Sequence, residues 1–332
     1  MSHVNLNIVY EKIYEKEQTR INNKLAKLFL KNKPDSLYDP CKYIMNNGGK
    51  RLRPLLVLFS KLAVTGSMKG AYNAALAVEI LHNFTLVHDD IMDKSSLRRG
   101  RETVHLKYDP NAAILAGDNL IGVAYKTLIK DCDKSCTSIV NSFTNAIIEV
   151  CEGQSYDTEY ERRKNVTVDE YLVMIRKKTA VLLEACCEIG GTLGNGSPQQ
   201  IKALKQYGMN IGMAFQFQDD LLDIMGEEKK FGKPIGADLL EGKKTYMFLK
   251  AYEKARGKEK KALREIIEKK GTSKQKIDYY REIYLKLGVI EEAKKEIENY
   301  TRKALNSIKK IENEEAVKLF TWLAYSLIKR NY

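Results

Sequence analysis

Apolar residues recur along most of the chain with the three-to-four-residue spacing of helices that bury one face. Proline, glycine and capping residues interrupt this spacing at intervals typical of ordinary helix lengths. Strand-like alternation bounded by hairpin turns is absent. We therefore expect an all-α protein. The predicted helices cover approximately residues 5–31, 38–46, 54–65, 69–93, 110–131, 135–157, 167–192, 198–225, 243–255, 258–270, 273–286, 289–309 and 313–330.

Capping sequences support three of the predicted helix starts. Asp109 followed by Pro110 is typical of an N-cap and a first helical residue. The segments 167–170 and 197–200 each begin with a hydroxyl residue and carry Glu or Gln three positions later. This pattern predicts a capping box at each start.

The same pattern suggests how the helices are distributed. Four of them are long and apolar on more than one face, so we expect them to lie centrally: 69–93, 135–157, 167–192 and 198–225. The helix at 5–31 and the charged amphipathic helices within 243–332 would be peripheral. No linker rich in Ser, Gly or Pro divides the chain, so we predict one domain, a helical bundle spanning 1–332.

Composition narrows the class of protein. Apolar residues make up 44% of the chain and charged residues 30%, as in soluble globular proteins. No run of 18 uncharged apolar residues occurs, and residues 1–7 lack the apolar core of a signal peptide. We therefore expect a cytoplasmic protein without a membrane span. Six cysteines without a Cys-x-x-Cys pair and four histidines disfavour a disulfide framework and a structural zinc site.

The chain is basic, with 56 Lys and Arg against 43 Asp and Glu and a net charge of +13. Such an excess is typical of proteins that bind nucleic acid or another anionic surface. No nucleic-acid-binding motif is present, and the lysines are spread through 229–310 as on solvated helix faces. A polyanionic substrate that brings its own cations is the other interpretation. Charge alone does not separate the two.

Two Asp-Asp-x-x-Asp motifs each close a long apolar helix. Asp89 and Asp93 are four residues apart, so they share a helix face and repel each other. They also lie at the helix C-terminus, where the dipole disfavours negative charge. One such motif would favour a solvated acidic helix end, whereas two favour a site for divalent cations. The candidate metal ligands are Asp89, Asp90, Asp93, Asp219, Asp220 and Asp223.

Basic segments accompany both motifs. Residues 48–54 combine glycines and cations before a helix start, which suits either phosphate binding or a surface turn. Arginines within 96–101 would neutralise the nearby aspartates or bind phosphate. Residues 176–179 put cations and a hydroxyl inside an apolar helix, where burial requires an anion. The glycine-bearing segment 232–245 is either a lid or an ordinary loop.

Two acidic trios, nearby cations and an apolar helical interior fit one kind of chemistry. A diphosphate leaving group would be held through metal ions, while a hydrocarbon tail occupies the interior. Mg²⁺ binds oxygen ligands and bridges carboxylates and phosphates. Together with Lys and Arg it would draw charge from the bridging oxygen, so that the carbon–oxygen bond ionises.

From about residue 38 onward, the chain resembles the trans-isoprenyl diphosphate synthases, or polyprenyl synthetases. The matching motifs occur in the family's order and spacing at 48–54, 89–93, 98–100, 153–154, 178–179 and 217–223. The resemblance implies the isoprenoid synthase type I fold, an all-α bundle around a deep central cavity, in a homodimer. It also implies about three Mg²⁺ ions per site. The reaction implied is ionisation, condensation of isopentenyl diphosphate with an allylic diphosphate (dimethylallyl, geranyl or farnesyl), and elimination.

The resemblance also implies roles for single residues. Asp89 and Asp93 would bind two Mg²⁺ and Asp219 the third, supported by Asp220 and Asp223. The residues implied for the allylic diphosphate are Arg98, Lys178, Lys233 and Lys243. Those implied for isopentenyl diphosphate are Lys50, Arg53, His82 and Arg99.

Three further roles follow from the same resemblance. Thr179 and Gln216 would face the allylic cation, and Gln154 would line the chain-binding region. His88 has no role in the resemblance, so we expect it to be structural. The chain departs from the family at Glu102, where Pro is more usual. This position lies beyond the diphosphate-binding arginines, so we expect little effect on the chemistry.

The helix before the first motif bears on product length. Phe84 is five residues before Asp89, roughly 7–8 Å along the helix axis, and shares a stripe with Leu81 and Ala77. An aromatic wall at Phe84 beside Thr85 resembles the archaeal type of geranylgeranyl diphosphate synthase. The motif also lacks the two-residue insertion common in bacterial farnesyl synthases. We predict a C20 product, with C15 as the near alternative.

Other classes fit the motifs less well. Terpene cyclases share one Asp-rich motif, but their second motif usually mixes Asn, Ser or Thr with Glu. A non-catalytic helical partner subunit would lose ligands, whereas this chain keeps all the motif aspartates. A helical Ca²⁺-binding or nucleic-acid-binding module has no motif of its own here.

Overall fold

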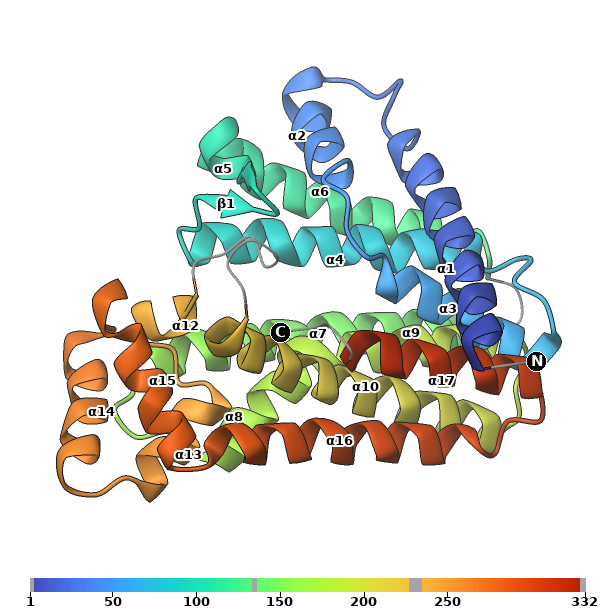
Figure 1. Cartoon of the computed structure of the whole chain (residues 1–332). Coiled ribbons are helices and arrows are strands. Elements are labelled where there is room, and N and C mark those ends of the chain that lie inside the picture. The colour runs from blue at the N-terminus through green and yellow to red at the C-terminus, as the bar shows by residue number, and fades with distance from the viewer. Residues whose placement is uncertain (1–2, 133–135, 227–234, 329–332) are drawn as a thin grey trace. The chain divides into compact units, whose positions relative to one another are not determined.

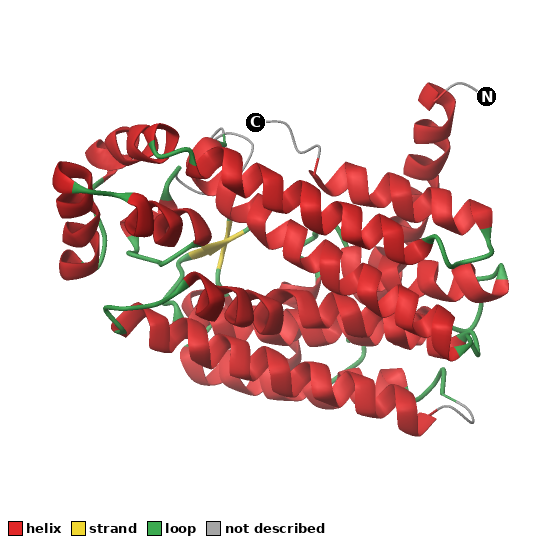
Figure 2. Cartoon of the chain, turned by 90° about the horizontal axis from the view of Figure 1, so that it is seen from below, coloured by secondary structure: helices red, strands yellow, loops and turns green. Residues whose placement is uncertain are grey.

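The computed structural model describes residues 3–132, 136–226 and 235–328, with side chains from residue 8 onward. Most of this chain is helical, and Figure 2 shows one short pair of strands among the helices. The prediction of an all-α protein is therefore confirmed. In the part that is described, no helix is long and apolar enough to cross a membrane.

The chain forms two compact units. The first comprises Met1–Asn145, Ala185–Lys205 and Ile308–Trp322, and the second comprises Ala146–Glu184, Gln206–Ser307 and Leu323–Tyr332. Among the described helices, four contribute several residues to both units: α7 (Cys136–Arg162), α9 (Val181–Leu193), α10 (Pro198–Met225) and α17 (Glu314–Ile328). Whether the chain is one domain stays a prediction.

The first unit is built around α4 (Tyr72–Met92), which runs alongside α6 (Pro110–Leu128) in Figure 1. Every residue from Ala74 to Leu81 is buried, so the middle of α4 is covered on all faces. The helices that pack around it are α1 (His3–Ala26), α2 (Asp35–Met45), α3 (Leu52–Thr65) and α5 (Val104–Lys107).

Glu79 is the charged residue within this buried run of α4, and it is paired with Arg51. The Arg51 guanidinium lies 2.5 Å from Glu79 Oε1 and also donates to the backbone oxygen of Met45 and to Asn22 Oδ1. Arg51 precedes α3 in the left-handed region, with φ 52°. Because one guanidinium joins α1, α2 and α4, the segment before α3 is held firmly in the first unit.

The second unit has an aromatic core. The ring of Phe217 on α10 packs against Tyr246 of α13 and Tyr300 of α16, with centroids 4.8 and 5.6 Å apart. The elements lying in this unit or largely in it are α8 (Val168–Ile175), the π-helical turn η1 (Arg176–Ala180), α12 (Ala237–Leu240), α13 (Tyr246–Lys254), α14 (Gly257–Lys269), the 3₁₀ turn η2 (Lys274–Lys276), α15 (Ile277–Lys286) and α16 (Val289–Ile308).

The predicted helix starts are confirmed by their caps. Asp109 accepts a hydrogen bond from Ala112 N, with Pro110 as the first residue of α6. Both arms of the capping box form at 167–170, before α8, and at 197–200, before α10. These local patterns therefore determine where the helices begin.

The strands β1 (Leu97–Arg98) and β2 (Arg101–Glu102) form an antiparallel hairpin that the apolar pattern did not predict. Two-residue strands are too short to show an alternating period. The turn places Arg99 and Gly100 at φ 54° and 74°, as in the hairpin turns in which both central residues have positive φ.

Candidate functional site

The first acidic motif ends α4 with its aspartates in different environments. Asp90 is 1% exposed, and its Oδ1 accepts hydrogen bonds from Arg98 Nε at 2.9 Å and Nη2 at 2.5 Å. Burial raises the pKa of Asp90, and the Arg98 charge opposes this shift. Asp89 is half-buried and Asp93 is exposed at the C-cap. The outer two aspartates are thus better placed for a metal ion than Asp90.

The hairpin after this motif joins the glycine-rich segment 48–54. Arg99 donates to the backbone oxygen of Gly48. A Cβ added to Gly49, which has φ 127°, would lie 2.8 Å from Arg99 Nη1. Glycine at this position therefore leaves room for the guanidinium. Lys50, the next residue, is exposed.

Arginines surround His82 in the first unit. Arg53 Nη1 lies 3.1 Å from His82 Nε2. Burial lowers the pKa of His82 well below its ordinary value, and the charge of Arg53 adds to this effect. The charges of Arg99, Arg98 and Arg51 act in the same direction. A neutral imidazole among several guanidinium groups is an environment that favours a bound anion.

The second acidic motif, at the end of α10, repeats the arrangement of the first. Asp220 is 4% exposed and accepts hydrogen bonds from the Tyr171 hydroxyl and from Gln216 Nε2. Burial, and then the charge of Asp238, raise the pKa of Asp220 to about 7. Asp219 is half-buried, as Asp89 is. In both motifs the middle aspartate is thus bonded within the protein.

The last aspartate of the second motif anchors the following loop. Asp223 accepts hydrogen bonds from Gly236 N at its backbone oxygen and from Asp238 N at Oδ2, at 2.7 and 3.2 Å. The loop carries Lys243, whose amide donates to Asp238 O at 2.8 Å. Lys233, which the resemblance assigned to the allylic diphosphate, lies outside the described residues.

A cavity of about 130 Å³ lies beside Asp220 in the second unit. Lys178 Nζ lies 2.5 Å from Asp157 Oδ2, and Thr179 Oγ1 is 2.9 Å from Gln216 Oε1. The cavity therefore brings together several residues predicted from sequence. It is lined by Asp157, Tyr171, Met174, Ile175, Lys178, Thr179, Gln216, Asp220, Asp238, Lys243, Lys244 and Thr245.

Asp157, Tyr171 and Asp238 line this cavity but were not predicted as site residues. A sequence signal existed for Asp157, which follows the Gly153-Gln154 motif by one helical turn. Tyr171 and Asp238 enter the site through partners distant in sequence, and no local pattern identifies them.

The two residues assigned to the hydrocarbon chain are both buried. Gln154 is 6% exposed, and neither its Nε2 nor its Oε1 has a hydrogen-bond partner among the described residues. Phe84 is 7% exposed and packs edge-on against His88, with centroids 4.8 Å apart. His88 lies over Gly117 of α6, where a Cβ would be 2.2 Å from His88 Nε2. His88 thus supports Phe84 by packing.

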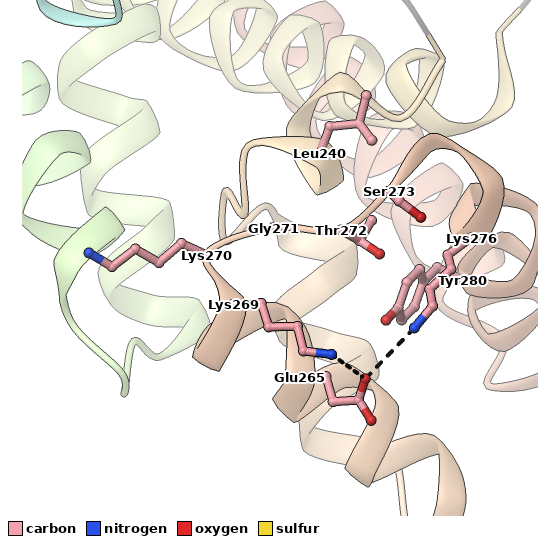
Figure 3. Close-up of a pocket in the computed structure, with 9 residues that line it drawn as sticks. All are labelled: Leu240, Glu265, Lys269, Lys270, Gly271, Thr272, Ser273, Lys276 and Tyr280. Atoms are coloured by element: carbon pink, nitrogen blue, oxygen red, sulfur yellow. Dashed lines mark hydrogen bonds and ion pairs between the residues drawn. The ribbon is translucent and has the colours of Figure 1, made fainter.

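A larger pocket of about 440 Å³ lies on the second unit and contains none of the predicted site residues. In Figure 3, Lys269 and Lys276 both point toward Glu265, whereas Lys270 points away from it. The two ion pairs measure 3.3 and 3.8 Å. Lys269 and Lys276 are thus paired with Glu265 on the surface, where such ion pairs contribute little to stability.

The predicted residues therefore divide between the units. Those in the first are Lys50, Arg53, His82, Phe84, Asp89, Asp90, Asp93, Arg98 and Arg99. Those described in the second are Gln154, Lys178, Thr179, Gln216, Asp219, Asp220, Asp223 and Lys243. That the two acidic motifs share one pocket stays a prediction.

The carboxylates of the two acidic motifs are oxygen ligands of the kind that Mg²⁺ prefers. Among the described residues, no group of three or more His, Cys, Asp or Glu side chains could hold a metal ion. Mg²⁺ is usually bound by one or two carboxylates together with water and substrate phosphates. Asp89 with Asp93, and Asp219 in the other unit, fit this mode, because they are less buried than Asp90 and Asp220 and lie near helix ends.

Comparisons with known proteins agree with this chemistry. The family profile described as polyprenyl synthetase matches residues 34–284. The geranylgeranyl diphosphate synthase of Saccharolobus solfataricus is 38% identical over 99% of each chain. Curated relatives include geranylgeranyl and geranylfarnesyl diphosphate synthases.

Solved structures show the same similarity in three dimensions. The geranylgeranyl pyrophosphate synthetase of Pyrococcus horikoshii matches with a TM-score of 0.90 and 35% identity, covering 97% of this chain and 98% of that one. A polyprenyl synthase of Caulobacter crescentus, solved with calcium and isoprenyl diphosphate, matches with a TM-score of 0.88 and 26% identity over 97% of each chain.

Proposed function

Since the chain belongs to the polyprenyl synthetase family and is a trans-prenyltransferase, we propose that it makes geranylgeranyl diphosphate. It would join isopentenyl diphosphate to allylic diphosphates of increasing length and stop at C20. The observation that carries the proposal is the repeated geometry of the two acidic motifs. In each, the middle aspartate is buried and bonded to the protein, while the first is only half-buried at a helix end.

In this proposal, residues of the first unit bind isopentenyl diphosphate. Arg53 and His82 are already in contact, and Arg99 and Lys50 lie on the segments that flank them. A neutral His82 can donate one hydrogen bond without competing with the arginines for charge. A diphosphate would relieve the repulsion among these cations, which favours a multiply charged anion.

The allylic diphosphate would be bound for ionisation by four basic residues: Arg98, Lys178, Lys233 and Lys243. Asp89, Asp93 and Asp219 would hold Mg²⁺. When bound, Mg²⁺ would neutralise the leaving diphosphate as the carbon–oxygen bond breaks. Thr179 and Gln216, which are hydrogen-bonded to each other, would direct their oxygens toward the allylic cation. Both are uncharged, so they stabilise the cation without capturing it.

The carbon–carbon bond forms when the double bond of isopentenyl diphosphate attacks the allylic cation. The resulting cation loses a proton to the departing pyrophosphate, which regenerates a double bond. Charge and atoms balance without a side-chain base. Product length would be limited by Phe84, whose ring is held against His88.

The test is an assay of purified protein with Mg²⁺, labelled isopentenyl diphosphate and each allylic starter, followed by chromatography of the products. We expect a C20 product, and we expect Asp89→Ala and Asp219→Ala each to lower kcat by at least about 100-fold. A chelator should abolish turnover until Mg²⁺ is restored.

Asp278→Asn provides the matched control, since Asp278 is 84% exposed in an ion pair on α15. Its turnover should equal that of the wild type. A C15 product would replace the C20 assignment by the farnesyl alternative. No product from any starter would overturn the enzymatic proposal in favour of a non-catalytic partner subunit.

A further inference from the structure

The backbone that carries Lys178 and Thr179 is a single π-helical turn, η1, between α8 and α9. Such turns are rare and occur frequently at functional sites. An isolated π turn has poorer packing along its own axis than an α-helix, so its shape must be maintained by neighbours. The elements that contact η1 therefore determine where these two side chains point.

A glycine on α7 meets the first half of the turn. A Cβ added to Gly153 would lie 2.3 Å from Lys178 N and 2.7 Å from Lys178 Cα. Real Cβ contacts essentially never fall below 3.0 Å. Because both atoms belong to the backbone, no rotation of a side chain could make room. The backbone of α7 therefore lies directly against the turn at Lys178.

A glycine on α10 meets the other end in the same way. A Cβ on Gly212 would lie 2.5 Å from Ala180 Cα and 2.7 Å from Ala180 Cβ. The π turn is thus contacted closely by two helices, each at a position where only glycine fits. These two close contacts of η1 are additional to the hydrogen bond and the ion pair of its side chains.

Each glycine also lies four residues before a side chain that contacts a side chain of η1. Gly153 and Asp157 share a face of α7, and Asp157 forms an ion pair with Lys178. Gly212 and Gln216 share a face of α10, and Gln216 Oε1 accepts a hydrogen bond from Thr179. On both α7 and α10, the helix face whose glycine lies against the η1 backbone therefore also carries the residue that contacts a side chain of η1.

We propose that Gly153 and Gly212 are positioning residues that clamp η1, so that Lys178 and Thr179 lie where ionisation of the allylic diphosphate requires them. The inference rests on the proposed function, which assigns those two residues their roles. A methyl group at either glycine would displace the turn by several tenths of an ångström. Displacements approaching 1 Å in a reacting site cost on the order of 100-fold in rate.

The competing explanation is that these glycines merely permit tight helix packing. Gly190 on α9 offers a matched control, because its Cβ would lie 2.3 Å from Val57 O, on α3 rather than on η1. Gly122 on α6 offers a second one, since nothing lies within 4 Å of its Cβ position. Ala at Gly122 should leave the melting temperature unchanged or raise it slightly, because Ala has the higher helix propensity.

The experiment compares Gly153→Ala, Gly212→Ala, Gly190→Ala and Gly122→Ala by melting temperature and by kcat and KM per folded molecule. We expect kcat of the first two to fall about 10–100-fold, with KM for isopentenyl diphosphate changed less than about threefold. Gly190→Ala should lower the melting temperature while keeping kcat, and Gly122→Ala should keep kcat without lowering the melting temperature. Loss of stability with unchanged kcat in the first two would overturn the proposal.

Amide hydrogen exchange of the wild-type protein supplies a measurement that needs no variant and no activity. A clamped turn should protect the amides of Lys178–Val181 as well as those of the buried part of α9. Exchange as fast as in the connecting segment 163–167 would overturn the clamp even if both variants failed to fold. If the wild type made no prenyl product, the proposed function would fail, while the exchange result would still decide whether the turn is clamped.

Discussion

At the scale of single residues, three arginines of the first unit differ in their partners. Arg51 and Arg98 are held by the buried carboxylates Glu79 and Asp90. Arg53 instead contacts the neutral ring of His82, and the charges of other arginines also act on this ring. The ion pairs of Arg51 and Arg98 stabilise the fold, and the several guanidinium groups around the neutral ring of His82 create a positive potential that favours a bound anion.

His82 makes the stability of the folded protein depend on pH. Its pKa in the folded protein is well below the ordinary value of 6.5, chiefly because of burial. Below about pH 6.5 the unfolded chain binds a proton that the folded protein does not, so stability falls as pH falls. Replacing His82 by Gln should remove up to about 1.4 kcal/mol of this loss per pH unit.

Urea unfolding of both proteins between pH 5 and pH 7 measures the effect. The difference between the two curves isolates His82, because the remaining groups titrate in both proteins. Parallel curves would mean that the pKa of His82 is the same in the folded and unfolded chain, which would contradict a lowered pKa in the folded protein.

At the scale of elements, α4 combines structural and chemical roles along its length. Its middle is fully buried around Glu79, and its end carries the first acidic motif. Phe84 and His88 lie between these two regions and contact each other on one face. The position of Phe84 between the core and the motif is what makes it a candidate floor for a growing hydrocarbon chain.

Phe84→Ala should lengthen the product beyond that of the wild type, because removing the ring opens space one and a half turns before Asp89. Product length is measured by chromatography after incubation with labelled isopentenyl diphosphate. Phe29→Leu, which alters a buried ring on the segment after α1, should reduce stability without changing the product. An unchanged chain length in Phe84→Ala would refute the floor assignment.

At the scale of the whole molecule, the family resemblance implies a homodimer, and α6 offers a surface for one. Ile114 and Leu115 are adjacent on this helix and are 43% and 59% exposed. Single exposed apolar residues are common, but neighbouring ones on a helix of the first unit favour contact with another surface.

Sedimentation of the wild-type protein should therefore give twice the chain mass of 37.9 kDa. Leu115→Glu should shift the population toward monomer, because the interface would bury an unpaired charge. Leu285→Glu changes a similarly exposed residue, 52% exposed on α15, and should leave the dimer intact. A monomeric wild type would contradict the dimer, and a dimeric Leu115→Glu variant would exclude α6 as its interface.

Much of the fold was predictable because its determinants are local. The helices begin at caps such as Asp109 and Thr167, which bond to residues three positions away. The hairpin at 97–102 and the π turn at 176–180 were not predictable from the apolar pattern. Each is too short to change the period of the surrounding residues, and the π turn meets glycines far away in sequence.

The sequence by itself determined the helical class, the family and the two acidic motifs, since these follow from residue spacing along one chain. Only the tertiary structure decided that the middle aspartate of each motif is buried, and which side chains it bonds to. Asp90 is bonded to Arg98 across the hairpin, and Asp220 to Tyr171 on another helix. The physical reason is that burial and hydrogen bonding depend on neighbours brought together by folding, which a one-dimensional pattern does not contain.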